Sequence, residues 1–423
     1  MISKHFSLRG HKAAIAGFCK ASNGLVSADR DGWVVVWNLE TKRPSGFWKA
    51  HDGQIITVIN TELGLLTQGR DSAIRIWNME GLAVETDLAL LGREGLPKPK
   101  FDEVPVNSLN FCNVDYTGGL LATVATTDSE KFDIYELSAP GKPFSLNRVV
   151  QGFSVGNGSV DETKRDGEGI IMKLRFVGSS LLFVGYESGT VKGFKIHDQS
   201  SIRSSASESL VLNKDLKLTE VFSYSGHAPQ PVLSLEFDTE EQKLYTGSAS
   251  KKLIVVSVEG LLSDGTSKGK TPPLTKSAPV KQGGLGSLLG RPKIELLEDD
   301  SEPVECHIST YNLRHSGISS IQINDYIHIV FWDGVLKTYT KDIVEVGRSE
   351  RGVERIKVES DQSEVAKPTT KALCGYLYEF DKSPQQHTSR KELLRLRRLK
   401  YSSLLFIGYG DNLISAYSID DKS

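Results

Sequence analysis

The chain has 423 residues, 39% of them hydrophobic, and its formal net charge is −2. Because a chain this close to neutrality has no overall positive field, we expect no direct nucleic-acid contact and no attraction to an anionic membrane. The opening MISKHFSLRGH lacks a signal-peptide core, and no stretch of about 18 apolar residues could span a bilayer. We therefore expect a soluble intracellular protein. Its scattered cysteines form no CxxC pair, which argues against a zinc cluster or a disulfide framework.

Two adjacent segments near the N-terminus repeat each other. The segment that begins at His11, HKAAIAGFCKASNGLVSADRDGWVVVWNL, matches the one that begins at His51, HDGQIITVINTELGLLTQGRDSAIRIWNM. Each contains three short strand-like stretches, and a small residue after an aspartate, Gly32 or Ser72, opens the turn before the third stretch. A repeat of about 40 residues with four strands per unit is typical of a β-propeller blade.

Weaker copies of this unit follow along the chain. At the position of the repeat tryptophan they carry Tyr135, Phe194, Val256, Tyr339 and Tyr417. With the first two units they make seven, which predicts an all-β, seven-bladed propeller that forms a single domain over residues 1–423. We expect the N-terminal KHFSL to supply the last strand of blade 7, because this strand would close the ring and leave no open sheet edge.

The spacing between units grows along the chain, and the excess residues form insertions. Residues 259–304 are rich in Gly, Ser, Pro and Lys and then turn acidic, which predicts a disordered surface loop or a docking strap. Shorter loop insertions are expected at 197–220 and 345–372. The basic run RKELLRLRRLK, residues 390–400, is expected to be the first strand of blade 7, with a solvated or channel-lining face. Contact with nucleic acid or an acidic partner is the alternative for this run.

The His, Asp and Trp positions of the first two units resemble the WD-repeat family. In that family a histidine, a serine or threonine, an aspartate and a tryptophan form one hydrogen-bonded line that ties a loop to a strand. The structural hydrogen-bond lines implied for blades 1 and 2 are His11, Ser27, Asp31 and Trp37, and His51, Thr67, Asp71 and Trp77. Blades 3, 4 and 7 lack the histidine and blades 5 and 6 lack the tryptophan, so we expect those blades to rely on packing alone.

A narrower resemblance covers roughly the first 80 and the last 30 residues. DGWVVVWNLETKRPSGFWKAHDGQI, LLTQGRD and the ending LLFIGYGDNLISAYSID resemble the ASTRA-associated protein 1 family of fungi, the counterpart of animal G-protein β-subunit-like protein 1. The resemblance implies a scaffold subunit of the ASTRA complex, linked to chromatin remodelling and to maturation of phosphatidylinositol-3-kinase-like kinases. It also implies a location in the nucleus, with the cytoplasm as a second location.

A G-protein β subunit proper is a less favoured interpretation. Only ten residues precede His11, which leaves no room for the N-terminal coiled-coil helix with which such subunits hold their partners. We therefore expect no G-protein γ subunit as a partner.

No set of residues in the sequence predicts catalysis. His11, Ser27 and Asp31 could suggest a hydrolytic triad, but the same arrangement recurs in the next unit, and catalytic sets are not duplicated blade by blade. The glycines of QGGLGSLLG do not lie between a strand and a helix, so they indicate a linker rather than a phosphate loop. The histidines do not pair with Cys, Asp or Glu at metal-ligand spacing. We expect no enzyme activity, no cofactor and no metal.

The residue just before each turn aspartate is the candidate for partner binding, since in WD-repeat propellers this position tends to project from the rim of one face. The candidates are Arg30, Arg70 and Trp332, residue types that are enriched in interface hot spots. The sequence therefore predicts a protein-binding scaffold in a multiprotein complex. The alternative is an adaptor that reads peptides or phosphopeptides, which a basic pocket containing both arginines would favour.

Overall fold

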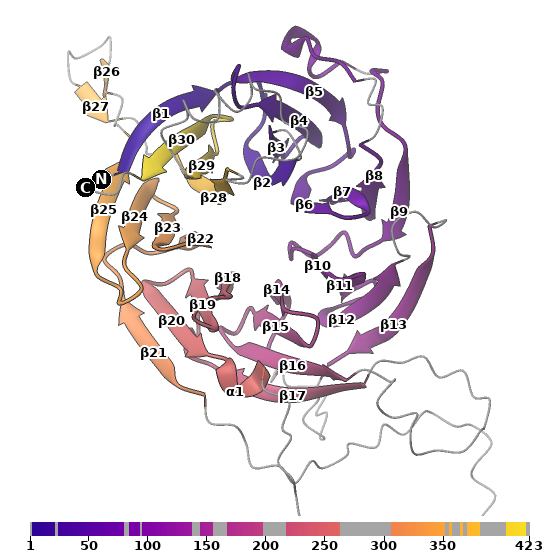
Figure 1. The fold of residues 1–423 in the computed structure, drawn as a ribbon, viewed down its shortest axis with the longest axis vertical. Coiled ribbons are helices and arrows are strands. Elements are labelled where there is room, and N and C mark those ends of the chain that lie inside the picture. The colour runs from indigo at the N-terminus through magenta and orange to yellow at the C-terminus, as the bar shows by residue number, and fades with distance from the viewer. Residues whose placement is uncertain are drawn as a thin grey trace, which may run out of the picture.

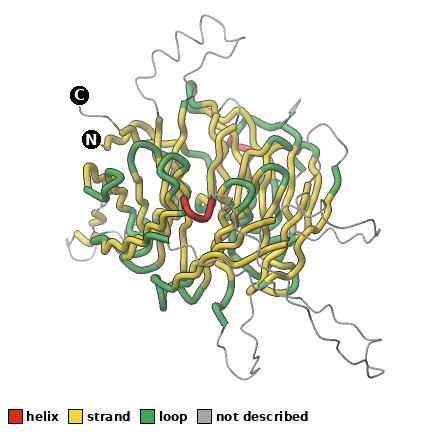
Figure 2. The backbone as a smooth tube through the Cα atoms, turned by 60° about the horizontal axis from the view of Figure 1, so that its bottom comes forward, coloured by secondary structure: helices red, strands yellow, loops and turns green. Residues whose placement is uncertain are grey.

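Seven four-stranded antiparallel sheets surround a central axis, which confirms the all-β, seven-bladed propeller (Figure 1). The structure is a computed structural model, and it describes residues 2–21, 24–79, 84–93, 95–137, 144–154, 167–197, 217–262, 306–351, 355–357, 364–366, 370–380 and 403–419. Strands make up nearly all of the regular structure (Figure 2). In the described ranges the only helical segments are η1 (Leu88–Leu90) and α1 (Glu259–Leu262), and neither is long and apolar enough to cross a membrane.

Each blade is one antiparallel meander, whose strands follow one another from the innermost to the outermost. Blade 1 consists of β2 (Ile15–Ala21), β3 (Gly24–Asp29), β4 (Trp33–Asn38) and β5 (Arg43–Lys49). Blade 2 consists of β6 (Ile55–Thr61), β7 (Gly64–Gly69), β8 (Ala73–Trp77) and β9 (Phe101–Pro105). Blade 3 consists of β10 (Asp115–Thr117), β11 (Leu120–Ala125), β12 (Asp128–Leu137) and β13 (Leu146–Phe153). Blade 4 consists of β14 (Ile171–Val177), β15 (Leu181–Tyr186), β16 (Val191–His197) and β17 (Lys217–Tyr224).

The remaining blades follow the same order. Blade 5 consists of β18 (Val232–Asp238), β19 (Lys243–Ser248), β20 (Lys252–Ser257) and β21 (Ile308–Asn312). Blade 6 consists of β22 (Ile318–Ile323), β23 (Ile327–Phe331), β24 (Val335–Tyr339) and β25 (Glu345–Glu350). Blade 7 consists of β28 (Ala372–Glu379), β29 (Ser403–Tyr409), β30 (Ile414–Ile419) and β1 (Ile2–Leu8). A separate hairpin of β26 (Arg355–Lys357) and β27 (Glu364–Ala366) lies between blades 6 and 7 in the chain.

The N-terminal strand closes the ring. In Figure 1, β1 at the indigo end of the chain lies beside β30 at the yellow end, and the two strands pair antiparallel from Ile2↔Ile419 to Leu8↔Ile414. Ile2 and Leu8 are buried at the two ends of this pairing. The expected role of KHFSL is thereby confirmed, and the closed ring has no free sheet edge between its first and last blades.

The core lies between the blades. Every residue of β3, β15 and β29 is buried, because the second strand of a blade is covered on both faces by neighbouring blades. Aromatic rings bridge the sheets: Trp48 of blade 1 meets Trp77 of blade 2 at a ring-centroid distance of 5.7 Å. This packing explains why the second-strand sequences, such as LLFVGY and SLLFIGY, are almost continuously apolar.

The insertions are narrower than the expected ranges. Residues 217–220, assigned to a loop at 197–220, are the start of β17, and residues 345–350, assigned to a loop at 345–372, are β25. Each supplies the outermost strand of its blade, where one polar face meets solvent and the apolar signal is weak. In the expected insert 259–304, residues 259–262 form α1 and bury Leu261, while residues 263–304 lie outside the described residues.

The expected first strand of blade 7 was wrong. That strand is β28, which pairs with β29 from Ala372↔Tyr409 to Glu379↔Ser403. The basic run 390–400 lies outside the described residues. The leucines of 390–400 alternate roughly as in a strand, whereas β28 reads ALCGYLYE and does not alternate, so periodicity favoured the wrong segment. Burial of Ala372 and Tyr378 in the ring shows that β28 completes the blade.

Candidate functional site

The hydrogen-bond line of blade 1 uses a different aspartate from the one expected. His11 Nδ1 lies 2.7 Å from Asp29 Oδ2, its Nε2 lies 2.7 Å from Ser27 Oγ, and Trp37 Nε1 donates to the same Oγ at 2.7 Å. Asp29 Oδ1 accepts the N–H groups of the turn that follows, at 3.0 and 2.9 Å. Asp31 is exposed and contributes only its backbone to these contacts, so its assignment to the line was wrong.

Blade 2 contains the line at the expected positions. His51 Nδ1 lies 2.8 Å from Asp71 Oδ1, and Thr67 Oγ1 lies 2.8 Å from both His51 Nε2 and Trp77 Nε1. Burial alone would raise the pKa of Asp71, but hydrogen bonds from His51 and the Asp52 N–H, with the positive charge of Arg75, outweigh burial and lower this pKa to about 2.

Blades 5, 6 and 7 keep parts of the line, so for these three blades the expectation that they rely on packing alone was wrong. In blade 5, His227 Nε2 lies 2.7 Å from Thr246 Oγ1, and in blade 6, His315 Nδ1 lies 2.6 Å from Asp333 Oδ2. In blade 7 the hydroxyl of Tyr409 lies 2.9 Å from that of Tyr417, which stands in the tryptophan position. Burial lowers the pKa of His227 to about 4, which keeps this imidazole neutral at physiological pH.

These polar sets have a structural role. Ser27 and Asp29 are completely buried and Asp29 uses both carboxylate oxygens on protein donors, so no atom of the set can reach a substrate. A nucleophile and its base need an open side where a reacting atom can sit. In blades 1 and 2 the arrangement therefore ties the turn to the strands.

The three candidate binding residues lie on one face of the ring. The backbone N–H groups of Arg30, Arg70 and Trp332 donate, each at 2.9 Å, to the loops that enter the first strands of their blades. Because strand direction alternates within a blade, these loops and the turns after the second strands share one face, which we call the turn face. Within the described ranges none of the three side chains contacts another, so the structure gives no shared basic pocket.

Arg70 instead belongs to a patch that the sequence did not reveal. Its guanidinium lies 4.2 Å from the centroid of the Phe111 ring, and its Nε donates to the Ser108 carbonyl at 3.4 Å. Phe111 is 54% exposed and Leu109 is 81% exposed, the largest exposed fractions among aromatic and leucine side chains in the described chain. We call Arg70, Leu109 and Phe111 the Phe111 patch.

The loop that carries this patch, residues 106–114, is held in place by hydrogen bonds of buried side chains. The buried Asn107 donates to Ala125 O at 3.0 Å, and the buried Asn110 accepts from Cys112 N at 2.6 Å. Gln68 of blade 2 donates to Cys112 O at 2.9 Å and accepts from Val114 N at 3.0 Å. The loop thus turns two apolar side chains outward on a backbone that is already ordered, which lowers the entropic cost of binding a partner.

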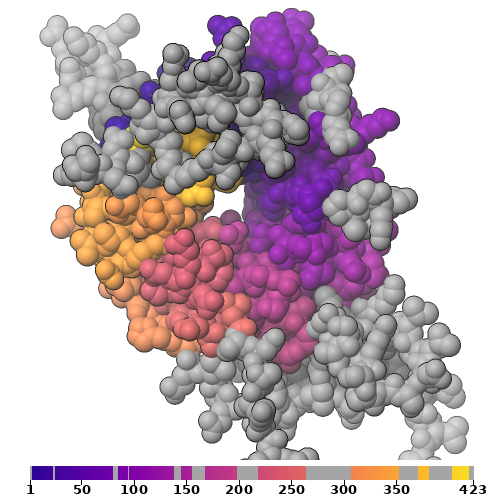
Figure 3. Space-filling model, in the orientation of Figure 1, coloured from indigo at the N-terminus to yellow at the C-terminus, as the bar shows by residue number. Residues whose placement is uncertain are grey.

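The central channel is lined by two layers of side chains, because alternate residues of each innermost strand point inward. Strand register places the seven residues of the layer next to the turn face, the mouth layer, at Gly17, Thr57, Asn113, Lys173, Ser234, Ser320 and Cys374. The inner layer, two residues further along each strand, is Cys19, Ile59, Asp115, Arg175, Glu236, Gln322 and Tyr376. Together they surround a cavity of about 620 Å³, and Figure 3 shows the opening in the middle of the ring.

Channel side chains also link neighbouring blades. Asn113 of blade 3 donates to Leu174 O of blade 4 at 2.9 Å and accepts from Leu174 N at 3.2 Å. Gln322 of blade 6 accepts from Leu377 N of blade 7 at 3.0 Å, and the Tyr376 hydroxyl accepts from Lys20 N of blade 1 at 3.0 Å. These polar groups are therefore committed to holding the ring together.

The described part of the chain contains no group of three or more His, Cys, Asp or Glu side chains that could hold a metal ion. The buried thiols are also unreactive by environment. Burial raises the pKa of Cys112 to about 12 and that of Cys19 further still, which keeps both in the thiol form at physiological pH.

Comparison with known proteins identifies the family. The family described as ASTRA-associated protein 1 matches residues 4–417 of this chain. The ASTRA-associated protein 1 of Clavispora lusitaniae is 36% identical over 436 residues, which cover 100% of this chain and 98% of that protein. Those of Meyerozyma guilliermondii and Debaryomyces hansenii are 31% and 27% identical, and each alignment covers 98% of both chains. Because these similarities extend over the whole propeller and confirm the resemblance of its two ends, the chain belongs to the ASTRA-associated protein 1 family.

Proposed function

We propose that this protein is a non-catalytic scaffold subunit of the ASTRA complex and that it holds another subunit of the complex on its turn face. The family name speaks of association with ASTRA. The observation that carries the proposal is the Phe111 patch, in which two exposed apolar side chains and a guanidinium sit on a loop anchored by buried asparagines.

The composition of the patch defines the partner. Among the described residues neither Arg30 nor Arg70 has a carboxylate within ion-pair distance, so neither guanidinium is neutralised on this face. Arginine donates two parallel hydrogen bonds to a carboxylate, and exposed aromatic and leucine side chains are buried by apolar ones. We therefore expect a subunit segment in which apolar side chains stand next to an acidic one.

The absence of catalysis is part of the same proposal. Support comes from the polar sets of blades 1 and 2, which are used up in structural hydrogen bonds, and from the family and fold of the chain. The further roles, in chromatin remodelling and in maturation of phosphatidylinositol-3-kinase-like kinases, belong to the proposal too. These roles imply that the protein is located in the nucleus, with a fraction in the cytoplasm during kinase maturation.

The test is quantitative capture of ASTRA subunits by the tagged chain, with the captured proteins identified by mass spectrometry. Leu109→Ser with Phe111→Ser should lower recovery at least about ten-fold if the patch is the hot spot. Val344→Ser with Val346→Ser is the matched control, since it removes two exposed apolar side chains at the outer strand of blade 6. Wild-type recovery with the patch variant, at an unchanged melting temperature, would move the interface elsewhere.

The finer roles need their own measurement. In cells that carry only the patch variant, we expect lower steady-state amounts of newly made phosphatidylinositol-3-kinase-like kinases and a normal amount of the variant itself. Normal kinase amounts in cells whose variant no longer captures ASTRA subunits would show that the scaffold has no role in kinase maturation. The alternative of a phosphopeptide reader is weaker, because Arg30 and Arg70 make no mutual contact and neither lines the central cavity.

A further inference from the structure

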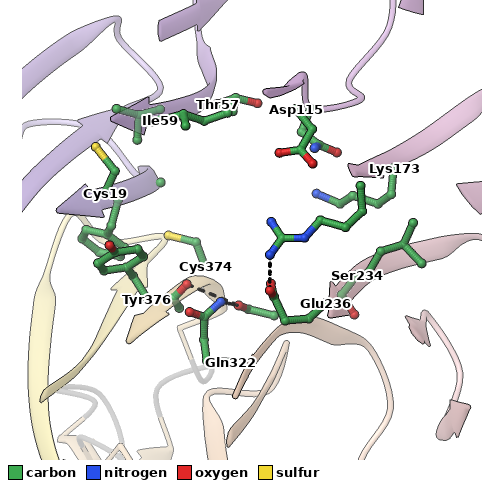
Figure 4. A pocket seen from close by; sticks show the side chains of 18 of the residues that line it. Cys19, Thr57, Ile59, Asp115, Lys173, Ser234, Glu236, Gln322, Cys374 and Tyr376 are labelled. Atoms are coloured by element: carbon green, nitrogen blue, oxygen red, sulfur yellow. Dashed lines mark hydrogen bonds and ion pairs between the residues drawn. The ribbon is translucent and has the colours of Figure 1, made fainter. Parts of the chain in front are cut away.

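The mouth layer of the central channel contains one charged side chain. It is Lys173, at the third position of β14 in blade 4, and Figure 4 shows its ammonium directed toward the middle of the pocket. The other side chains of this layer are hydroxyls, an amide and a thiol. The mouth layer therefore presents a net charge of +1 to whatever enters from the turn face.

Most polar groups of the mouth layer already have partners. Thr57 Oγ1 donates to Gln68 Oε1 at 2.8 Å, Asn113 is bonded to the Leu174 backbone, and Ser320 Oγ donates to Gly375 O at 3.3 Å. Cys374 Sγ lies 3.9 Å from Ile15 O. These side chains are occupied in holding the ring together, and a ligand would have to compete with the backbone for them.

Two groups of the mouth layer differ, and they stand on adjacent blades. Lys173 Nζ makes no hydrogen bond or ion pair with any described residue, and Ser234 Oγ is buried without a hydrogen-bond partner. A buried donor without a partner costs about 1–3 kcal/mol, and Ser234 Oγ is such a donor. Lys173 is only partly buried, and its ammonium extends into the channel. Together they place an unpaired donor and an unpaired cation on adjacent blades at the mouth of the cavity.

The charges around Lys173 favour an anion above the inner layer. Arg175 is paired with Glu236, and Asp115 accepts the Phe176 N–H at 2.6 Å, so both inner-layer carboxylates already have a partner. Burial lowers the pKa of Lys173 itself. Burial raises the pKa of Cys374 to about 12, while the positive charges of Arg30 and Lys173 act in the opposite direction. Both cations therefore lie near the Cys374 thiol at the mouth of the channel.

The amount of charge limits the kind of anion. Over both layers Lys173 and Arg175 balance Asp115 and Glu236, and only Lys173 is free to meet a ligand. With this balance a bound carboxylate adds one net negative charge and a doubly charged phosphate adds two, and uncompensated charge is costly in a site that is partly shielded from water. A carboxylate carries a single charge and has two oxygens for two donors. A cavity of about 620 Å³ is ample for it and lies within the usual range of ligand sites.

We propose that the mouth layer is a carboxylate-binding site, in which Lys173 Nζ pairs with the carboxylate and Ser234 Oγ, after rotation about its Cα–Cβ bond, donates a hydrogen bond to it. The carboxylate belongs either to an acidic side chain on a segment laid across the turn face or to a small free acid. Both sources present the same group to Lys173. The site is separate from the Phe111 patch and stands whether or not that patch binds a subunit.

The test follows Lys173 directly. Dimethylation of the lysines with ¹³C keeps their charge and gives each an NMR signal, and loss of one signal in Lys173→Arg assigns it. Sodium acetate should move the Lys173 signal saturably, while sodium chloride at equal ionic strength should not. The lysine control is Lys195, on β16 of the same blade and outside the cavity, whose signal should stay in place.

Matched serine variants test the second donor. Ser234→Ala should weaken acetate binding about 3- to 10-fold, because a hydrogen bond to a charged group is lost. Ser320→Ala removes a hydroxyl of the same layer that is already bonded to Gly375 O and should leave the affinity unchanged. Equal effects of both serine variants would remove Ser234 from the site. Tighter binding of inorganic phosphate than of acetate would show that the assigned class of ligand is wrong.

The source of the carboxylate is decided with capped peptides. Acetyl-Gly-Asp-Gly-amide should saturate the Lys173 signal at lower concentration than acetate if a partner segment is the source, and acetyl-Gly-Asn-Gly-amide should not shift it. Acetate binding without response to the aspartyl peptide assigns the site to a small free acid. A Lys173 signal that responds to neither probe overturns the proposal.

Discussion

Asp29 in blade 1 and Asp71 in blade 2 bind the equivalent atom, Nδ1 of the histidine of their own blade, although their positions differ by two residues in the repeat. The reason lies in Gly69, which occupies the position equivalent to Asp29. A Cβ on Gly69 would overlap His51 Nδ1 and Asp71 Oδ1, so the missing side chain makes the room in which Asp71 reaches the imidazole. In blade 1 the Asp29 carboxylate fills that room, and Asp31 is left at the surface.

Substitution of the two aspartates of blade 1 should therefore have unequal effects. Asp29→Ala removes a fully buried acceptor from His11 and from two turn N–H groups, which should cost about 3 kcal/mol of unfolding free energy. Asp31→Ala should change it by less than about 0.5 kcal/mol. Urea denaturation of both variants measures the difference, and a larger loss for Asp31→Ala would show that the exposed carboxylate is the structural one.

The low pKa of Asp71 predicts how stability depends on pH. The carboxyl has a pKa of about 2 in the folded chain against its ordinary value of 3.8, so the unfolded chain binds the proton more readily. This contribution, about 2 kcal/mol, is fully present above about pH 5 and is lost as the pH falls toward 2. Asp71→Asn should flatten this part of the stability profile, whereas the exposed Asp31→Asn should reproduce the wild-type slope.

The repeat pattern was sufficient to predict those features of the fold that depend on local sequence. Alternating strands, turn residues and the 40-residue repeat of the first two blades are local properties, and together they predicted the ring, its closure by β1 and the line of blade 2. The choice of Asp29 was not predictable in this way, because it depends on space that Gly69 leaves open in one blade and not in the other. The sequence does contain a signal for Asp29, because alignment of the two repeats places this aspartate opposite Gly69.

Other features depend on contacts between distant parts of the chain. The leucines of the run 390–400 alternate roughly as in a strand, whereas β28 has no such alternation and is identified by its pairing with β29. The exposure of Leu109 and Phe111 results from Asn107 and Asn110, whose side chains turn inward to blade 3. A leucine and a phenylalanine in the sequence NSLNFCN would ordinarily be assigned to the core. Their exposure is set by the anchoring amides rather than by hydropathy.

Two buried tryptophans provide a matched pair for the value of the indole hydrogen bond. Trp37 donates to Ser27 Oγ at 2.7 Å, whereas Trp48 Nε1 is buried with no hydrogen-bond partner among the described residues. Replacement by phenylalanine removes the same volume at both sites. Trp37→Phe should cost about 2 kcal/mol more than Trp48→Phe, because only the former breaks a hydrogen bond and the latter removes an unpaired donor. Equal losses in chemical denaturation would mean that the Trp37 bond adds nothing to stability.

Removal of residues 264–303 should leave the propeller folded. The strands on either side of this segment are already joined, since Ser257 N donates to His307 O at 2.9 Å and β20 pairs with β21. Leu261 is buried and Leu262 packs on the same cluster, so the deletion begins after them. Shortening a loop changes the closure free energy little, and the melting temperature should stay within a few degrees. Insoluble protein would show that the segment packs as part of the fold, and folded protein that no longer captures ASTRA subunits would make it a docking strap.

The turn face can be divided into independent parts by double-mutant cycles of subunit capture. Arg70 and Phe111 are in contact at 4.2 Å, so Arg70→Ala and Phe111→Ala should be non-additive, with a coupling of at least about 0.5 kcal/mol. Trp332 is 38% exposed and its cationic neighbour is Lys371, at 5.8 Å from the ring, so it shares no contact with Arg70. Arg70→Ala and Trp332→Ala should therefore add within about 0.3 kcal/mol.

These cycles also weigh the sequence-predicted cluster against the patch found in the structure. If Arg30, Arg70 and Trp332 acted as one hot spot, charge reversal of both arginines with Trp332→Ala would abolish capture and the Arg70–Trp332 pair would show strong coupling. The separation of their contacts predicts instead that the loss follows Arg70 and Phe111, with Trp332 making a small additive contribution. Melting temperatures should hardly change in the arginine variants, whereas Trp332→Ala also removes the part of the ring that packs over Gly317 and should lower the melting temperature. Strong coupling between Arg70 and Trp332 would show that one partner segment spans the mouth of the channel and touches both.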